Sequence, residues 1–243
     1  MKQILLLFII SLFLLSCSDD KAGCFSSSGD QDVITIPLSP EVDSIASSGR
    51  MRVYFIQDSL NEIEISGGSN VIKGIRCSEN NNRLEISDEN TCNWVRRLDR
   101  IPVVTVHYTS LRCFEAGNYY DNLFLEPHQG DSILIEYWNG SGKTTFVGDV
   151  DRAYFKINAG AGSIEGSGTA DYCYIYHSGG GKINCSALYS TDALVSNGSN
   201  NDISISVSRS LFCDIRRTGN IFYSGEPSDI TRVGLGPGQL IKQ

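Results

Sequence analysis

The pattern that decides the fold reads ILIEYWNGSGKT at residues 133–144 and returns as FKINAGAGSI at residues 155–164. It recurs as YIYHSGGGKI at 174–183, LVSNGSNNDI at 194–203 and IRRTGNI at 215–221. Each copy holds a short apolar strand, a glycine turn and a residue that opens the next strand. Two columns keep one period of about 20 residues, namely the turn glycines Gly140, Gly160, Gly179, Gly198 and Gly219 and the openers Thr144, Ile164, Ile183, Ile203 and Ile221. A fixed period of this length is the signature of a repeat architecture.

A unit this short cannot bury its own apolar face, so it must stack on its neighbours with like side chains aligned. We therefore expect an all-β fold, a single-stranded β-solenoid of roughly six coils, each adding about 4.7 Å to its length. The inward columns should lie three and five residues before each turn glycine. They read Tyr137, Ile157, Tyr176 and Val195, and Ile135, Phe155, Tyr174 and Ala193. In the last coil Cys213 and Ile215 are the apolar residues, one position early, which predicts a one-residue slip before Gly219.

The first half of the domain, up to Tyr108, alternates strand patterns with loops rich in Asn, Gly and Asp but keeps no repeat columns. The expected strands are Val33–Ile36, Met51–Ile56, Glu62–Ile65, Arg83–Ile86 and Val103–Val106. The sequence thus predicts one β-helical domain over residues 33–243 with a less regular N-terminal half.

The N-terminus has the pattern of a targeting segment. Residues 1–17 hold one lysine and an apolar run that is too short to span a membrane, which is typical of a signal peptide. The segment Leu14-Leu15-Ser16-Cys17 resembles the bacterial lipobox, which implies cleavage before Cys17 and a lipid on its thiol. An ordinary secreted protein is the alternative. Residues 18–32 form a polar tether, and its Ser18-Asp19-Asp20 start resembles the export tag of Bacteroides and Flavobacteria lipoproteins. We therefore expect an outer-membrane lipoprotein, on the cell-surface or the periplasmic side, whose membrane partner is reached through the lipid.

The C-terminal segment Gly219-Asn220-Ile221 and Tyr223-Ser224-Gly225-Glu226-Pro227, followed by Gly234-Leu235-Gly236, resembles the closing segment of a known family. With the turns Gly140-Ser141-Gly142 and Gly160-Ala161-Gly162, the chain is similar to the head GIN domain of the putative auto-transporter adhesin family (domain of unknown function 2807) from about Val42 to Leu240. The resemblance implies a right-handed parallel β-helix, an envelope location and an adhesin-like role. It carries over no catalytic or binding residues.

Charge and motif content narrow the chemistry. A net charge of -8 and a pI near 4.9 argue against a nucleic-acid partner, because phosphate binding needs clustered Lys and Arg; the one cluster, Arg96, Arg97 and Arg100, is typical of a solvated loop. No Cys-x-x-Cys, H-E-x-x-H, G-x-S-x-G or P-loop pattern occurs, so we expect no cofactor, no metal and no enzymatic activity. Besides Cys17 and Cys24, Cys77 with Cys92 is the expected disulfide, whereas Cys113, Cys173 and Cys213 are expected as small buried hydrophobes.

Surface aromatics are the better guide to function. Five candidates for a surface that stacks on a glycan or protein ligand are Tyr119, Tyr120, Trp138, Tyr172 and Tyr189. Strand filling is the alternative for these side chains. Two other functions stay open: a carbohydrate-active enzyme, for which Asp149 and Asp151 beside Arg152 are the closest group, and a structural protein that forms homo-oligomers.

Overall fold

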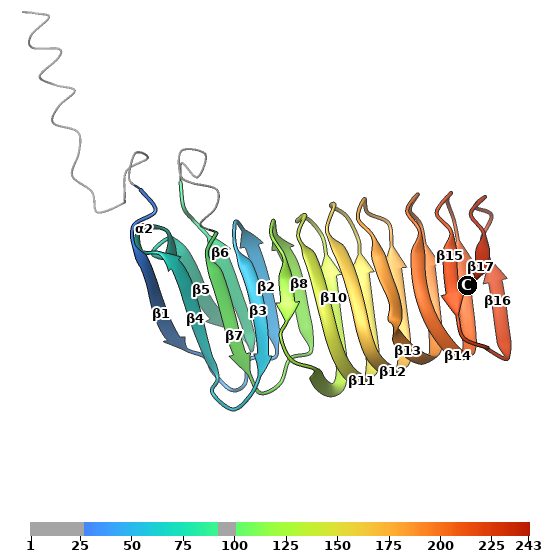
Figure 1. Ribbon diagram of the computed structural model, residues 1–243, viewed down its shortest axis with the longest axis horizontal. Coiled ribbons are helices and arrows are strands. Elements are labelled where there is room, and N and C mark those ends of the chain that lie inside the picture. Colours follow the sequence, from blue (N-terminus) through green and yellow to red (C-terminus); the bar gives the residue numbers. More distant parts are fainter. Residues whose placement is uncertain (1–26, 92–100) are drawn as a thin grey trace, which may run out of the picture.

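The computed structural model describes residues 27–91 and 101–243. They form an elongated β-solenoid of about six turns, in which strands stack side by side along one long axis (Figure 1). Among the described residues, no helix is long and apolar enough to cross a membrane. The predicted all-β solenoid with an irregular N-terminal part is confirmed.

The regular part consists of long parallel strands that each cover both faces of the solenoid. They are β10 (His128–Tyr137), β11 (Lys143–Ile157), β12 (Ser163–His177), β13 (Ile183–Asn197) and β14 (Ile203–Ile215). The first half of β11 pairs with β9 (Asn122–Phe124), and its second half pairs with β10. Each coil therefore has a glycine corner between strands and a bent corner within the strand, at the top and bottom of Figure 1. The last coil is made by β15 (Ile221–Ser224), β16 (Asp229–Val233) and β17 (Leu240–Lys242).

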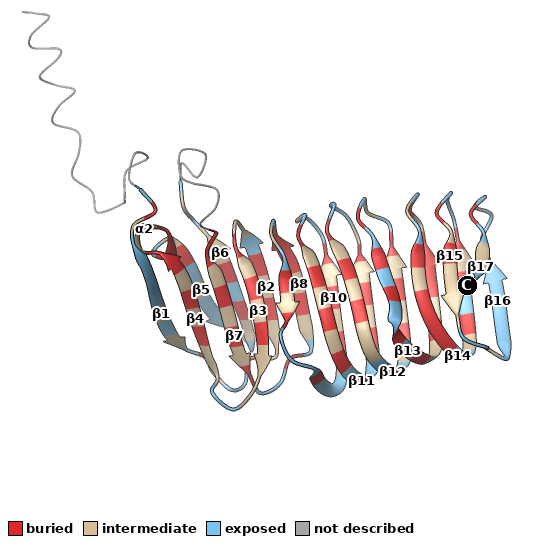
Figure 2. Cartoon of the chain, viewed as in Figure 1, coloured by how far each residue is buried: buried red, intermediate tan, exposed pale blue. Residues whose placement is uncertain are grey.

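The predicted column of strand openers is confirmed. Thr144 pairs with Ile164, and the ladder continues through Ile183 and Ile203 to Ile221. All five side chains are buried. Figure 2 shows the resulting alternation of buried and mainly intermediate bands along the strands. This alternation is the period of two that stacked strands impose, so every second residue of each coil joins the core.

The predicted inward columns need two corrections. Val195 is buried but pairs with Ile175, so it continues the column of Ile135 and Phe155, whereas the buried Asn197 continues that of Tyr137 and Ile157. Tyr174 and Tyr176 point outward and are half-buried, whereas Ile175 and His177 are buried on the inside. His177 pairs with Ile157, and Gly180, not Gly179, stands 20 residues after Gly160 in this register. Counting from Gly179 therefore placed the column one residue too early, on the opposite side of the strand.

The other inward residues are buried as expected. Tyr137, Ile157, Ile135, Phe155, Val195, Ala193, Cys213 and Ile215 all lie in the core. A one-residue slip was expected in the last coil, before Gly219. The register already changes earlier, in the third coil. Val195 pairs with Ile175 and with Cys213.

The N-terminal half belongs to the same sheet but follows a different path. Its strands are β1 (Gln31–Pro37), β2 (Ser44–Gly49), β3 (Arg52–Gln57), β4 (Glu62–Gly68), β5 (Ile75–Asn80), β6 (Arg83–Asp88), β7 (Val103–Tyr108) and β8 (Cys113–Asn118), with one helical turn, α2 (Ser69–Ile72). All five strands expected here are present, whereas β2, β5 and β8 were missed. β2 lies between β6 and β8, and β3 lies between β7 and β9. The chain therefore begins at the end with β1, makes the inner coil β2–β3, goes back to the end as β4 and β5, and then returns past that coil through β6 and β7.

The turn glycines have different reasons to be glycine. Gly140 and Gly160 have φ of 81° and 83°, in the left-handed region that favours glycine. Gly179, Gly198 and Gly219 do not have positive φ. A Cβ on Gly219 would lie 2.1 Å from the Asn201 carbonyl oxygen, so close packing between coils requires glycine there.

Candidate binding surface

The five predicted aromatics divide between the two corners. Tyr119 and Tyr120 lie between β8 and β9, and Trp138 follows β10 at the same glycine corner of the next coil. Tyr119 and Trp138 are each 56% exposed, and the Arg52 guanidinium lies 6.0 Å from the Tyr120 ring centroid. Tyr172 and Tyr189 lie at the bent corner instead. The structure thus does not bring all five into one surface.

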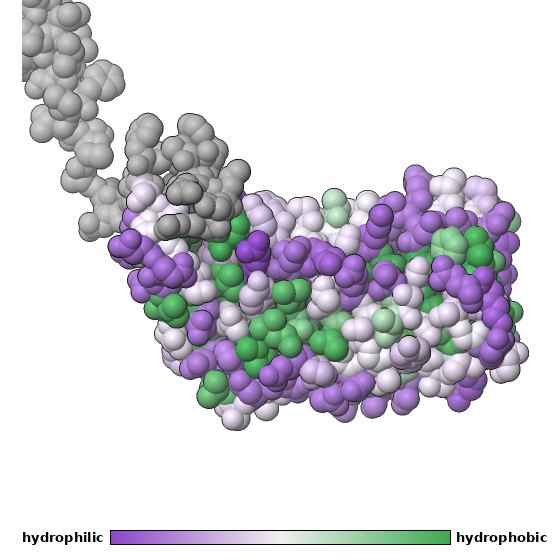
Figure 3. Space-filling model, in the orientation of Figure 1, coloured by the Kyte–Doolittle hydropathy of each residue, from purple (hydrophilic) through white to green (hydrophobic). Residues whose placement is uncertain are grey.

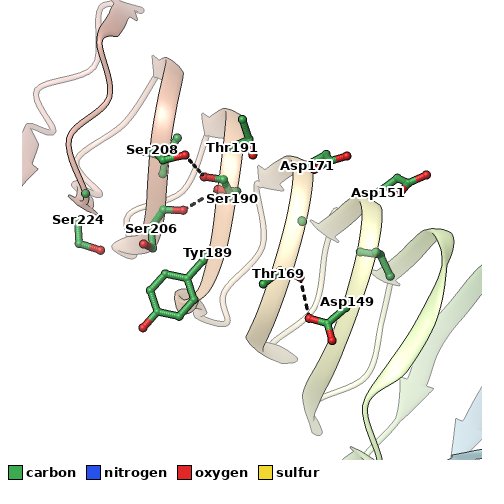
Figure 4. A pocket seen from close by; sticks show the side chains of 14 residues that line it. Asp149, Asp151, Thr169, Asp171, Tyr189, Ser190, Thr191, Ser206, Ser208 and Ser224 are labelled. Carbon is green, nitrogen blue, oxygen red and sulfur yellow. Dashed lines mark hydrogen bonds between the residues drawn. The ribbon is translucent and has the colours of Figure 1, made fainter.

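The bent corner carries the larger of two neighbouring hollows, with a volume of about 760 Å³. Tyr189 stands at its rim and is 67% exposed (Figure 4). Val150, Ala170 and Val207, which are buried, line its floor. The site is an open groove across β11, β12, β13 and β14 rather than a closed cleft.

A change of register makes this groove. Cys185 pairs with Ile205, but Tyr189 pairs with Ser206, the next residue of β14. Three residues of β13 therefore have no counterpart on β14, and the coil becomes narrower at this corner. Tyr189 is left at the rim above the shorter strand. The glycine columns do not reveal this difference in length between β13 and β14, because they lie at the opposite corner of the coil.

Two rows of polar side chains run along the groove, parallel to the solenoid axis. Asp149, Thr169 and Tyr189 form one row, and Asp151, Asp171 and Thr191 form the other (Figure 4). Thr169 Oγ1 donates to Asp149 Oδ1 at 2.7 Å, and Gln129 Nε2 donates to its other oxygen at 3.1 Å. The hydrogen bonds from Thr169 and Gln129 lower the pKa of Asp149. Asp149 is therefore held as a carboxylate, which does not suit a general acid.

The second hollow, of about 420 Å³, shares Asp151, Asp171 and Thr191 with the first. Tyr172 and Arg152 also line it. On its far side Asp192 accepts hydrogen bonds from Arg209 and Ser210. These hydrogen bonds, with that from Arg209 the largest cause, lower the pKa of Asp192 to about 2. Asp149 and Asp151 are the carboxylates that a carbohydrate-active enzyme would use, and they lie on the rims of open hollows.

The sequence reasoning missed a row of outward-facing side chains, which lies on the face formed by the second halves of the long strands. It consists of Leu134, Tyr154, Tyr174, Leu194 and Phe212, in register along the axis. The rings of Tyr154 and Tyr174 are 6.3 Å apart, and Lys156 Nζ lies 5.8 Å from the Tyr174 ring. The repeat of Tyr154, Tyr174 and Leu194 at a step of 20 was the available signal. On the opposite face, hydrophobic side chains gather over β3, β9 and β11 (Figure 3).

The cysteines fall into two groups. Cys173 and Cys213 are buried as expected, and burial raises the pKa of each thiol to about 12. Cys113 is only half-buried, because it pairs with Leu134 in the outward row. Cys77 is a free thiol among the described residues, and its disulfide with Cys92 stays a prediction. Its expected partner Cys92 lies outside the described residues, as do Cys17, Cys24, Arg96, Arg97 and Arg100.

Across residues 27–91 and 101–243, no group of three or more His, Cys, Asp and Glu side chains is placed to hold a metal ion. Together with the open shape of both hollows, the arrangement offers stacking and hydrogen bonding to a ligand.

Comparison with solved structures finds the same fold elsewhere. A putative adhesin from Bacteroides fragilis is 18% identical, with a TM-score of 0.80 over 89% of this chain and 99% of that chain. A putative adhesin from Parabacteroides distasonis is 15% identical, with a TM-score of 0.66 over 89% and 99% of the two chains. A structure from the same organism, described as a putative lipid binding protein, is 16% identical, with a TM-score of 0.65 over 88% and 97%. These identities support a shared fold alone.

No curated protein matches the chain. Residues 41–227 match the family described as putative auto-transporter adhesin, head GIN domain. The match covers most of the solenoid, from β2 through β15, and includes both hollows. The chain therefore belongs to the putative auto-transporter adhesin, head GIN domain family.

Proposed function

We propose that this protein is a lipid-anchored envelope protein that acts as a non-enzymatic, adhesin-like binding module. The observation that carries the proposal is the family match over residues 41–227. Membership in an adhesin family supports a binding role at the cell surface or in the envelope. The open hollows and exposed aromatics at the solenoid corners fit such a role, since recognition by stacking needs accessible rings.

The anchor rests on the N-terminal sequence. Cys17 follows Leu14-Leu15-Ser16, and residues 18–32 are polar. A polar linker of this kind holds a folded domain away from the bilayer. Acyl chains contribute about 0.8 kcal/mol per buried methylene, so two or more chains anchor a protein stably.

Metabolic labelling with a palmitate analogue tests the anchor. We expect the full-length chain to take up the label and to fractionate with membranes, and Cys17→Ala to lose both properties because the thiol is the acceptor. Cys24→Ala is the matched control, since it also removes a thiol near the N-terminus, and it should keep the label. Label that survives Cys17→Ala would contradict the lipid anchor.

An adherence assay tests the binding role. Bacteria that express the full-length chain should attach to epithelial cells, mucus or other bacteria more strongly than a deletion strain does. Expression of Cys17→Ala should not restore attachment, because the unanchored protein cannot hold the cell. Equal attachment of all strains to every surface would count against the adhesin-like role.

The outward row from Leu134 to Phe212 favours a second candidate, a self-associating envelope protein. Phe212 is 39% exposed in that row. Sedimentation of the protein in detergent distinguishes the two candidates. A mass that rises with concentration and falls for Phe212→Ser supports self-association.

A further inference from the structure

We infer that the two hollows at the bent corner form one binding site for a neutral oligosaccharide, with Tyr189 and Tyr172 as stacking platforms. The inference rests on the proposed binding function and names its ligand class. Tyr189 lines the first hollow and Tyr172 the second. Asp151, Asp171 and Thr191 form the ridge that both hollows share.

The aromatic side chains provide the platforms. Tyr189 is 67% exposed although it lies within a strand, and it lines a concave surface. A ring in that position can cover the apolar face of a pyranose, which carries C–H groups, and keep its hydroxyl in water. Tyr172 is half-buried, and its ring is held 6.4 Å from that of Tyr154. The ring of Tyr172 is thereby restrained before a ligand arrives, which reduces the ordering cost of binding.

The spacing predicts a ligand longer than one sugar. Thr169 pairs with Tyr189, and Tyr172 lies three residues further along the same strand. Three strand residues span about 10 Å. The two rings therefore contact different sugar units of one chain, with the shared ridge between them.

The polar groups match sugar hydroxyls better than they match a cation. Besides Tyr189, the first hollow has six serine and threonine side chains and three carboxylates: Thr169, Ser190, Thr191, Ser206, Ser208 and Ser224, with Asp149, Asp151 and Asp171. Ser190 and Ser208 already donate to main-chain carbonyls, so their oxygens can only accept from a ligand. Hydroxyls both donate and accept hydrogen bonds, as sugar hydroxyls do, whereas a cation needs acceptors alone. Asp149 is already occupied by Thr169 and Gln129.

The charge of the first hollow selects against acidic sugars. Its lining holds three aspartates and no lysine or arginine. The second hollow adds Arg152, Arg209 and Asp192, and Arg209 is paired with Asp192, so the combined site holds four aspartates and two arginines. A uronate, sialate or sulfate group would meet like charges at close range in the first hollow, which disfavours binding. Neutral hexoses and N-acetylated hexosamines carry no such charge.

A glycan array tests the inference directly. The full-length chain, purified in detergent, is applied to neutral, sialylated, uronate-containing and sulfated glycans. We expect binding to neutral oligosaccharides, with little binding to their single sugars. Tyr189→Ala and Tyr172→Ala should each weaken binding by about tenfold, the upper range for one aromatic contact. Leu235→Ala also removes an exposed apolar side chain, but outside both hollows, and should bind as the parent does.

Other results overturn the inference. Binding to acidic glycans or to a polylysine peptide that is lost in Tyr189→Ala would assign the hollows another ligand. Neutral-glycan binding that both tyrosine variants retain would place the site elsewhere. Adherence of expressing bacteria without any neutral-glycan binding would remove the ligand class and leave the proposed function standing. Circular dichroism of each variant confirms that it folds.

Discussion

At the residue scale, the core contains polar side chains at the junction of the two halves. Asn122 and Thr144 continue the column of strand openers, and Asn122 Nδ2 donates to Thr144 Oγ1 at 3.1 Å. Asn118 Nδ2 donates to Asn122 Oδ1 at 2.8 Å, and the Tyr137 hydroxyl lies 2.7 Å from Thr144 Oγ1. All four side chains are buried, and each finds partners, so the network is compatible with a packed interior.

His128 makes stability depend on pH. It is buried beside Tyr108, Phe124 and Phe146, and burial lowers its pKa to about 4 from the ordinary 6.5. Between those pH values the unfolded chain binds a proton that the folded chain does not bind, so stability falls as pH falls from 6.5 to 4. A shift of that size corresponds to roughly 3 kcal/mol in the free energy of unfolding.

Urea denaturation across this pH range measures the effect. His128→Gln should flatten the dependence relative to the parent, because glutamine does not titrate. Tyr108→Phe is the control, since it removes the hydroxyl that lies 3.0 Å from His128 Nδ1 but keeps the titrating ring. Its stability should remain as dependent on pH as that of the parent. Parallel curves for the parent and His128→Gln would contradict the assignment.

At the scale of the element, the glycine corner shows why two glycines in matching positions are not equivalent. Gly160 has a φ of 83°, and a Cβ there would lie 3.0 Å from the carbonyl oxygens of Asn139 and Gly140. Gly180, its counterpart on the next coil, does not have positive φ, and its Cβ would lie 3.4 Å from the nearest atom, an ordinary contact. The first corner needs glycine for its backbone, and the second tolerates a side chain.

Alanine substitution at the two positions should therefore differ. Gly160→Ala should lower the free energy of unfolding by about 1–2 kcal/mol, the cost of placing an L-residue in the left-handed region. Gly180→Ala should change it by less than about 0.5 kcal/mol. Chemical denaturation of both variants gives the comparison. Equal losses would show that the corners are under the same constraint.

At the scale of the whole molecule, the two ends of the solenoid differ from its middle. Arg232 takes the place in the inward column that Val195 and Cys213 occupy in earlier coils. Its guanidinium donates to the Gly238 carbonyl at 2.9 Å, so a charged side chain covers the C-terminal end. Terminal units of repeat proteins need a polar outer side for solubility, and this coil has one.

Hydrogen exchange should map that difference. All five residues of β16 are exposed, and within the described part of the chain β16 pairs only with β14. We expect the amides of β16 to exchange orders of magnitude faster than the amide of Ile183, because β13 is paired with β12 on one side and β14 on the other. Mass spectrometry of the exchanging chain measures both segments. Uniform protection along the axis would indicate that the solenoid opens as a single unit.

The sequence by itself determined the solenoid, because a side chain inside a stacked coil contacts its equivalents one period before and after. That requirement is written in the spacing of Thr144, Ile164, Ile183, Ile203 and Ile221, and in the inward Cys213 and Ile215. It also marked Tyr172 and Tyr189 as surface aromatics. The inward columns and the surface positions both follow from contacts between neighbouring coils, and a periodic sequence pattern predicts such contacts.

The grouping of those aromatics and the position of the hollows became clear from the three-dimensional structure alone. The groove arises from a length difference between β13 and β14 at the bent corner, where neither of these two strands has a glycine to mark the register. The return of the chain past β2 and β3 joins residues far apart in sequence, so no local pattern encodes it. Tyr174 was assigned to the wrong side because one residue of drift in a triple-glycine turn reverses a strand's faces. The register and pairing of the strands, which repeat spacing alone does not specify, placed each of these features.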